Sequence, residues 1–203
     1  MTATVPRLLV LTDRAQIGDR SLVDVVGAAV DGGARGVVLR EKDLPHDQRV
    51  ALADEIRPIV EGAGGTFMVA SDPTIASSGV HLAVDDAFPV DRPPLVGRSC
   101  HDADELAAAE TEGCDYVMVA RVFPSLSKPG YRGVLGPTGL AELCAAATTA
   151  KVVALGGLNW LNVGSFVAGH RPYGVALMGE VMRSREPDRA VGRVLERHPE
   201  YAA

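Results

Sequence analysis

The chain has 203 residues, a formal net charge of −6 and 47% hydrophobic residues. This length is enough for one domain with a full core, and the acidic balance argues against a nucleic-acid partner, which calls for a basic face. The chain has no run of about 18 apolar residues and no signal-peptide pattern, so the sequence predicts no membrane span. Three scattered cysteines, Cys100, Cys114 and Cys144, favour reduced thiols in a cytoplasm, and a homo-oligomer is compatible with the sequence.

Apolar, strand-like runs alternate with helical patterns from one end of the chain to the other. The sequence predicts strands at 8–12, 36–40, 66–70, 79–83, 95–99, 116–122, 151–155 and 173–178. It predicts helices at 21–30, 47–60, 73–77, 102–112, 138–147 and 159–168, and a terminal helix that runs toward His198. About eight β/α units in regular alternation predict an α/β fold, a single (β/α)8 TIM barrel over residues 1–203. The helix of the fourth unit is weak or missing near 85–94, and the loop at 123–136 has the length of a functional lid.

The last two predicted strands each end abruptly in glycine. The first is followed by Gly156 and Gly157, and the second by Met178 and Gly179. Glycine has no Cβ, so a ligand can approach its backbone closely, and in a (β/α)8 barrel the loops after the last two strands hold phosphate. One Gly-Gly pair is more often a plain turn, but the repeat after two successive strands favours a phosphate site at this corner.

The other strands end in polar and charged residues, and strand ends carry the active site of a barrel. These residues are Arg40, Lys42, Ser71, Asp72, Asp86 and Ser99, followed by Ser125, Ser127 and Lys128 in the loop after the sixth strand. Arginine, lysine and hydroxyl groups suit phosphate oxygens, and Mg²⁺ prefers a couple of carboxylates together with substrate phosphates. The pattern therefore predicts a diphosphate site, with Asp72 and Asp86 as candidate Mg²⁺ ligands.

Each of these residues also has a purely structural interpretation. The alternatives are ion pairs of Arg40 and Lys42 with Glu41 or Asp43, a helix cap for Asp72, a solvated turn for Asp86 and an exposed turn for Lys128. His81 is predicted to be a hydrogen-bonded residue of the barrel, and His101 to stabilise its loop. The joint placement of so many polar groups at strand ends favours the functional interpretation.

In order along the chain, these residues lie in motifs that resemble those of the thiamine phosphate synthase/TenI superfamily. The motifs are LREKD at 39–43, SD at 71–72 for the family's ND, GVHL at 79–82 with Asp86 for GVHLGQED, GRSCH at 97–101 for GxSxH, DYV at 115–117 for ADYV, FPSLSK at 123–128 for FPTxTK and ALGGL at 154–158 for AIGGI. The similarity covers nearly the whole chain, and the motifs are specific as a set.

Synthases of this superfamily join a hydroxymethylpyrimidine diphosphate to a thiazole phosphate, which gives thiamine phosphate and pyrophosphate. The resemblance implies that Arg40, Lys42 and Lys128 grip the diphosphate, that Asp72 and Asp86 bind its Mg²⁺, and that Ser99 contacts the pyrimidine. It places the thiazole phosphate against Ser125, Ser127, Gly157 and the backbone near Gly179, with Gly156 and Met178 beside them.

Several positions depart from the synthase pattern. Synthases usually place glutamine at Val38 and asparagine at Ser71, and Glu180 adds a carboxylate beside the predicted phosphate corner. TenI-like thiazole tautomerases lack that glutamine too, but they often carry a histidine where Arg121 stands. Both metal carboxylates and the serine-lysine loop remain, so we favour the synthase. The alternatives are a thiazole tautomerase and a non-catalytic protein that binds a phosphate ligand.

Val38 distinguishes the two enzyme branches. It lies two residues before Arg40 on a strand, so both side chains point the same way. We therefore expect Val38 to face the barrel interior, just beneath the substrate, at a position where a synthase normally offers an amide to the pyrimidine.

Overall fold

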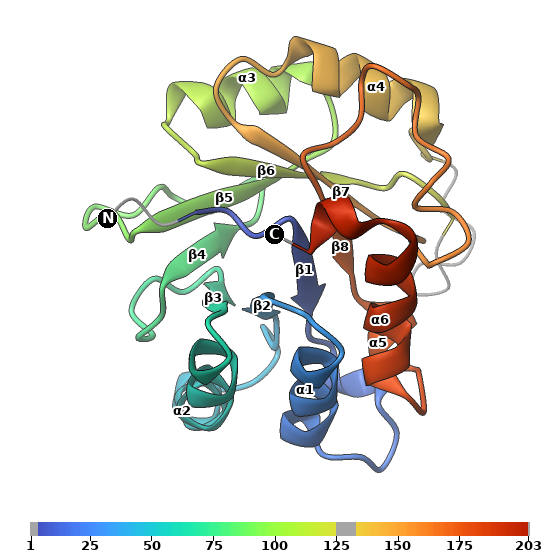
Figure 1. Cartoon of the computed structure of the whole chain (residues 1–203). Helices are drawn as coiled ribbons and strands as arrows, with labels where there is room; N and C mark the ends of the chain where they lie inside the picture. The colour runs from blue at the N-terminus through green and yellow to red at the C-terminus, as the bar shows by residue number, and fades with distance from the viewer. Residues whose placement is uncertain (1–3, 125–132, 203) are drawn as a thin grey trace.

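The computed structural model describes residues 4–124 and 133–202. Its strands are parallel and close into a barrel in chain order, with the eighth strand paired to the first (Figure 1). The strands are β1 (Leu8–Leu11), β2 (Gly36–Leu39), β3 (Thr66–Ala70), β4 (Gly79–Leu82), β5 (Leu95–Cys100), β6 (Tyr116–Ala120), β7 (Lys151–Leu155) and β8 (Gly174–Leu177). The barrel confirms the predicted fold class, and each strand boundary lies within two residues of its predicted place.

Helices pack against the barrel in two groups on opposite sides. They are α1 (Leu22–Asp31), α2 (His46–Gly62), α3 (Ala103–Thr111), α4 (Gly136–Ala146), α5 (Gly179–Met182) and α6 (Pro187–Arg197), with short 3₁₀ turns η1 (Arg14–Gln16) and η2 (Pro199–Tyr201). In Figure 1, α3 and α4 lie together on one side, opposite α1, α2 and the α5–α6 pair. The predicted carboxylate cap of α3 is confirmed, because the Asp102 side chain accepts from the backbone N–H of Glu105. Among the described residues, no helix has the length and apolar run of a membrane span.

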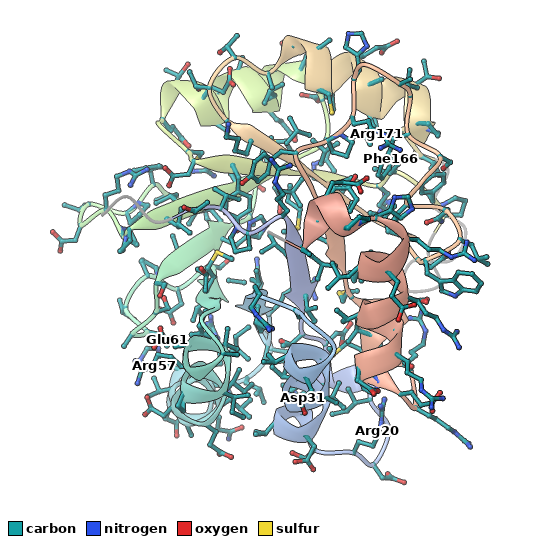
Figure 2. The ribbon with its side chains drawn as sticks, in the orientation of Figure 1. Arg20, Asp31, Arg57, Glu61, Phe166 and Arg171 are labelled. Atoms are coloured by element: carbon teal, nitrogen blue, oxygen red, sulfur yellow. The ribbon has the colours of Figure 1, made fainter. Side chains whose placement is uncertain are left out.

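The predicted helix at 73–77 is wrong, because turns and bends occupy this connection. The segment starts with proline, and the side chain of Asp72 takes the backbone N–H of Thr74 into a local turn instead of a helix. Helix α2 secures the connection from outside. Arg57 donates to the carbonyl of Ala76 at 3.3 Å, and Glu61 accepts from the Ser78 hydroxyl at 3.2 Å; both lie on α2 in Figure 2.

The predicted helix at 159–168 is also wrong, since this segment forms turns. Two asparagine side chains compete with helical hydrogen bonds there: Asn162 accepts from the backbone N–H of Asn159, and Asn159 accepts from that of Leu161, both at 2.9 Å. The connection after β4 likewise holds no helix, as the sequence predicts for 85–94. Three of the eight units therefore connect two strands without an α-helix.

The core has two layers, which follow from the alternation of side chains along each strand. One layer fills the barrel and includes Leu9, Leu11, Val38 and Met68, all buried. The other lies between the barrel and its helices. Val38 therefore faces the interior as predicted, and it is fully buried.

Gly97 makes room for the largest side chain inside the barrel. A Cβ at Gly97 would overlap the ring of Tyr116, which is itself fully buried. We expect Gly97→Ala to lower the free energy of unfolding by about 1–3 kcal/mol, the usual range for an overpacked core. Urea unfolding measures this difference. Gly27→Ala is the control, since a Cβ there meets nothing within 4 Å. Equal unfolding midpoints for wild type and Gly97→Ala would contradict the packing of Tyr116.

Candidate active site

A cavity of about 490 Å³ opens at the carboxyl ends of the strands. Six of the residues predicted for the site line it: Arg40, Ser99, Gly156, Gly157, Met178 and Gly179. They come from β2, β5 and the connections after β7 and β8, so the barrel brings together residues far apart in sequence. This is the end of the barrel where substrates bind in enzymes of this fold.

Of the other predicted residues, Val38 is fully buried on β2 and does not line this cavity. Lys42, Ser71, Asp72 and Asp86 do not line it either and lie after the ends of β2, β3 and β4. The predicted residues Ser125, Ser127 and Lys128 lie outside the described residues. The described part of the site therefore has two halves: a cavity toward β7 and β8, and a charged rim at β2 to β4.

Gly156 and Gly157 make room for another segment of the protein, whereas the sequence predicts that they make room for a ligand. Both have left-handed backbones, with φ of 103° and 64°. A Cβ on Gly156 would lie 2.9 Å from the Cα of Arg121, and one on Gly157 would overlap the carbonyl oxygen of Pro124. The missing Cβ atoms therefore admit the chain's own segment after β6, and the turn that results then faces the cavity.

Gly179 is likewise packed against the protein. A Cβ there would overlap the guanidinium of Arg183, one helical turn further along α5, and both residues line the cavity. Arg183 also donates to the side chain of Gln16. Sequence reasoning missed Arg183, although its spacing of four residues from Gly179 is the signal of a shared helical face.

Glu180 is half-buried at the same corner. Burial raises the pKa of Glu180 above its ordinary value, while Arg183 and Arg193 act in the opposite direction. A neighbouring arginine thus offsets the carboxylate that the sequence places beside the predicted phosphate corner. Arg121 also lines the cavity, so cationic side chains reach it from β2, from the segment after β6 and from α5.

Arg40 and Lys42 lie in a strand end whose acidic residues are engaged elsewhere. Glu41 is buried and accepts from the backbone N–H of Arg14 at 3.2 Å, and Asp43 pairs with the Arg14 guanidinium. Glu41 and Asp43 therefore contact Arg14, and no described ion pair joins them to Arg40 or Lys42. Both cations are exposed at the site.

The pKa of Lys42 depends on the charged groups around it. Lys42 is exposed as a whole, but the surrounding protein partly desolvates its amine, and this lowers the pKa of Lys42 below its ordinary value. Asp86 opposes this effect, and Arg40 and Arg49 add to it. The Lys42 amine therefore lies within electrostatic reach of both the cationic and the acidic groups of the rim.

Asp72 is held on three sides. Its Oδ1 accepts from the Thr74 hydroxyl at 2.6 Å, and its Oδ2 contacts His46 at 3.0 Å and the buried Arg49 guanidinium at 3.3 Å. The predicted capping role of Asp72 is therefore correct in part: its side chain caps a turn, not a helix. Burial alone would raise the pKa of Asp72, but the bonds from Thr74 and His46 outweigh it, so its pKa lies below the ordinary value and the carboxylate is ionised at neutral pH.

Ser71 forms a hydrogen bond with Asp86. It precedes Asp72 in the chain, and its hydroxyl donates to Oδ2 of Asp86. Its φ of 58° is left-handed, a conformation in which asparagine, the synthase residue here, is enriched. Serine at this position adopts the same conformation and donates to Asp86.

The two oxygens of Asp86 differ in their contacts. Its Oδ2 accepts from Ser71 and from the backbone N–H of Ala83 at 2.6 Å, while no described residue donates a hydrogen bond to Oδ1. Burial would raise the pKa of Asp86, but these two hydrogen bonds and the charge of Lys42 hold it below its ordinary value. An ionised, partly unsatisfied carboxylate beside Asp72 fits a Mg²⁺ ion that takes its other ligands from phosphate and water. Among the described residues, no group of three or more His, Cys, Asp and Glu side chains could enclose a metal without such help.

A buried polar chain leads from the barrel interior to the cavity. His81 contacts the Tyr116 hydroxyl through Nδ1 at 3.2 Å and Ser99 through Nε2 at 3.0 Å, which confirms the prediction of a hydrogen-bonded barrel residue. Burial lowers the pKa of His81 to about 3, and Lys42 and Arg40 contribute. The neutral imidazole therefore orients Ser99 instead of carrying charge. His101 bonds Glu105 at 3.0 Å, as expected for a loop-stabilising residue, and it also lines the cavity.

Comparison with known proteins identifies the family. The model of the family described as thiamine monophosphate synthase matches residues 8–181. The chain belongs to the thiamine monophosphate synthase family. A thiamine-phosphate synthase of Roseiflexus castenholzii is 33% identical over 192 residues, which cover 89% of this chain and 83% of the relative. A putative thiamine-phosphate synthase of Geobacter sulfurreducens is 34% identical, with 89% and 88% covered.

A solved structure agrees with membership of the thiamine monophosphate synthase family. The thiamine phosphate pyrophosphorylase of Pyrococcus furiosus superposes with a TM-score of 0.84 at 25% identity, and the match covers 97% of both chains. This confirms the resemblance to the thiamine phosphate synthase/TenI superfamily. The Amycolatopsis orientalis BexX/CysO complex, at 16% identity and a TM-score of 0.68, shares the fold alone.

Proposed function

We propose that this protein is a thiamine phosphate synthase, a transferase that joins hydroxymethylpyrimidine diphosphate to thiazole phosphate. The observation that carries this proposal is the rim beside the cavity, where Lys42 lies in the electrostatic field of Arg40 and of Asp86, an ionised carboxylate that accepts from the Ser71 hydroxyl. Cations and a pair of carboxylates at one edge suit a diphosphate with a divalent cation. We place the reaction in the cytoplasm, since all three cysteines are free thiols.

In this proposal Arg40 and Lys42, with Lys128, bind the diphosphate. The bond between the pyrimidine methylene carbon and the diphosphate oxygen breaks, and its electron pair leaves on pyrophosphate. Cationic side chains favour this step because negative charge builds on oxygen as the bond breaks. Asp72 and Asp86 would hold Mg²⁺, which supplies further charge stabilisation when bound.

The thiazole nitrogen then forms a bond to the methylene carbon, so no protein nucleophile is required. The proposal places the thiazole phosphate against the turn at Gly157 and Gly179, with Ser125 and Ser127. Arg183 lies at this corner and offsets Glu180. Ser99, oriented by His81, reaches the cavity where the pyrimidine would lie.

A second candidate, a TenI-like thiazole tautomerase, is favoured by one observation. Val38 lies fully buried in the barrel floor and offers no hydrogen bond to a pyrimidine. We expect Val38→Gln to bind the pyrimidine diphosphate about tenfold more tightly than wild type if the protein is a synthase, because an unpaired buried polar group costs about 1–3 kcal/mol. Isothermal titration measures both affinities.

Val38→Met is the control for this change, because methionine matches the size of glutamine without its amide. Equal affinities of Val38→Gln and Val38→Met for the pyrimidine diphosphate would mean that position 38 does not contact the pyrimidine.

Three incubations in parallel test the proposed function. The protein receives both synthase substrates, the thiazole carboxylate phosphate of a tautomerase, or thiamine phosphate alone. Thiamine phosphate formed in the first supports the synthase. Aromatisation in the second, with no product in the first, would replace it with the tautomerase. Tight binding of thiamine phosphate in the third incubation, with no product formed in the first two, would indicate a non-catalytic binding protein.

A further inference from the structure

The connection after β4 carries Asp86 but has no helix to hold it in place (Figure 1). A barrel connection normally returns through a helix that packs on the sheet and fixes the strand end. Here turns and bends run from residue 83 to residue 94. The position of the Asp86 carboxylate must therefore be fixed by other contacts.

Arg98 supplies them from the neighbouring strand. It lies on β5, where Ser99 points into the cavity and Arg98 points to the outer face. Only 4% of Arg98 is exposed. Its Nη1 lies 2.8 Å from the carbonyl oxygens of Ala83, Val84 and Asp86, and its two N–H groups donate to these three oxygens, so that one hydrogen is shared.

The second nitrogen of the guanidinium faces a carboxylate, while Nε of Arg98 is buried without a hydrogen-bond partner among the described residues. Nη2 of Arg98 forms an ion pair with Oε2 of Glu112 at 2.7 Å, just after α3. A buried cation without a partner would be strongly destabilising. Glu112 therefore allows Arg98 to remain charged beside the three carbonyls, and it ties the turn to the end of α3.

The turn is thus fixed from both of its sides. Arg98 holds the carbonyl oxygens of 83, 84 and 86, while the Asp86 side chain holds the backbone N–H of Ala83 and the Ser71 hydroxyl. With these bonds made, the Asp86 carboxylate has one orientation, and Oδ1 is the oxygen left for a ligand.

We propose that Arg98, with Glu112, is a positioning residue that pre-organises Asp86 for a divalent cation and its diphosphate. The choice of ligand rests on the proposed function; the clamp itself rests on the contacts of Arg98. Residues that orient a metal ligand typically change metal affinity about 10- to 100-fold when they are replaced.

Two measurements on the full chain test this. The first is hydrogen–deuterium exchange of residues 83–94 in metal-free protein. The second is titration of Mn²⁺ with inorganic pyrophosphate. We expect Arg98→Met to exchange faster at 83–94 while β5 and β6 stay protected, and to bind Mn²⁺ and pyrophosphate about tenfold or more weakly. Arg98→Lys keeps the charge and some carbonyl bonds, so it should fall between wild type and Arg98→Met.

Arg92→Met is the matched control, because Arg92 also bonds a carbonyl, that of Gly113, and pairs with Asp115, but it lies at the far end of the connection, just before β5. It should bind Mn²⁺ and pyrophosphate as wild type does and leave exchange at 83–86 unchanged. Glu112→Gln, a change at a partly exposed residue, serves if Arg98→Met fails to fold, and it should show the same two effects at smaller size.

The proposal is overturned if Arg98→Met shows the same hydrogen–deuterium exchange at 83–94 and the same affinity for Mn²⁺ and pyrophosphate as wild type. If Arg98→Met does not fold, the same result in Glu112→Gln overturns it. Weakened binding of thiazole phosphate by the same factor would also overturn it, since a general loss of structure would then explain the result. If wild type itself does not bind Mn²⁺ and pyrophosphate, the proposed function fails, and exchange at 83–94 alone decides whether Arg98 holds the turn.

Discussion

Asp86→Asn is expected to lower turnover with both synthase substrates by about 100-fold or more, because several kcal/mol of charge stabilisation at the departing diphosphate are lost. Asparagine keeps an oxygen to accept from the Ala83 N–H and from Ser71, so the turn should keep its shape. The amide lacks the negative charge that a divalent cation requires. Steady-state rates across a Mg²⁺ titration measure the change.

Asp85→Asn is the matched control for this prediction, since Asp85 is the exposed neighbour in the same turn. It removes the same charge one residue away and should leave the Mg²⁺ dependence unchanged. If Asp86→Asn keeps the Mg²⁺ dependence of wild type, Asp86 is not part of the metal site. If both variants lose turnover equally, the effect comes from the net charge of the turn.

Gly157→Ala is expected to lower kcat/KM for thiazole phosphate by about 100-fold, which corresponds to a loss of about 3 kcal/mol of transition-state stabilisation. The alanine Cβ would overlap the carbonyl oxygen of Pro124 and crowd Phe123, and the φ of 64° adds strain. The turn after β7 must move away from the segment after β6, and the phosphate corner opens. Initial rates at varied thiazole phosphate measure the loss.

Gly169→Ala is the control that distinguishes steric overlap of the new Cβ from backbone strain at a left-handed φ. Gly169 also has a left-handed φ, 85°, but a Cβ there meets nothing within 4 Å. Its variant should lose about 1–2 kcal/mol of stability and keep its affinity for thiazole phosphate. Unchanged kcat/KM in Gly157→Ala would mean that the thiazole phosphate binds away from this turn.

Much of the fold could be predicted from the sequence, because each barrel strand is covered on both faces and reads as a continuous apolar run. Strand ends were then enough to name Arg40, Ser99 and Gly157 as neighbours in the cavity. The alternation of side chains also placed Val38 correctly in the barrel floor. These features depend on local pattern and on the geometry common to all barrels of this kind.

The remaining features depend on contacts between distant segments. The sequence suggests that Gly157 makes room for a ligand, whereas the segment after β6 fills that space. Arg98 occupies the first of the two variable positions of the GxSxH motif, and its role appears only when β5 lies beside the turn after β4. The helix predicted at 159–168 fails because two asparagine side chains take local hydrogen bonds that no periodicity reveals.

The most direct test of the central claim follows phosphorus in one reaction. The protein is incubated with hydroxymethylpyrimidine diphosphate and thiazole phosphate in Mg²⁺, and ³¹P NMR records thiamine phosphate and pyrophosphate over time. A synthase with its metal at Asp72 and Asp86 forms the two products in equal amounts, and excess EDTA stops both. Absence of pyrophosphate in Mg²⁺, or its release at the same rate in EDTA, would contradict this account.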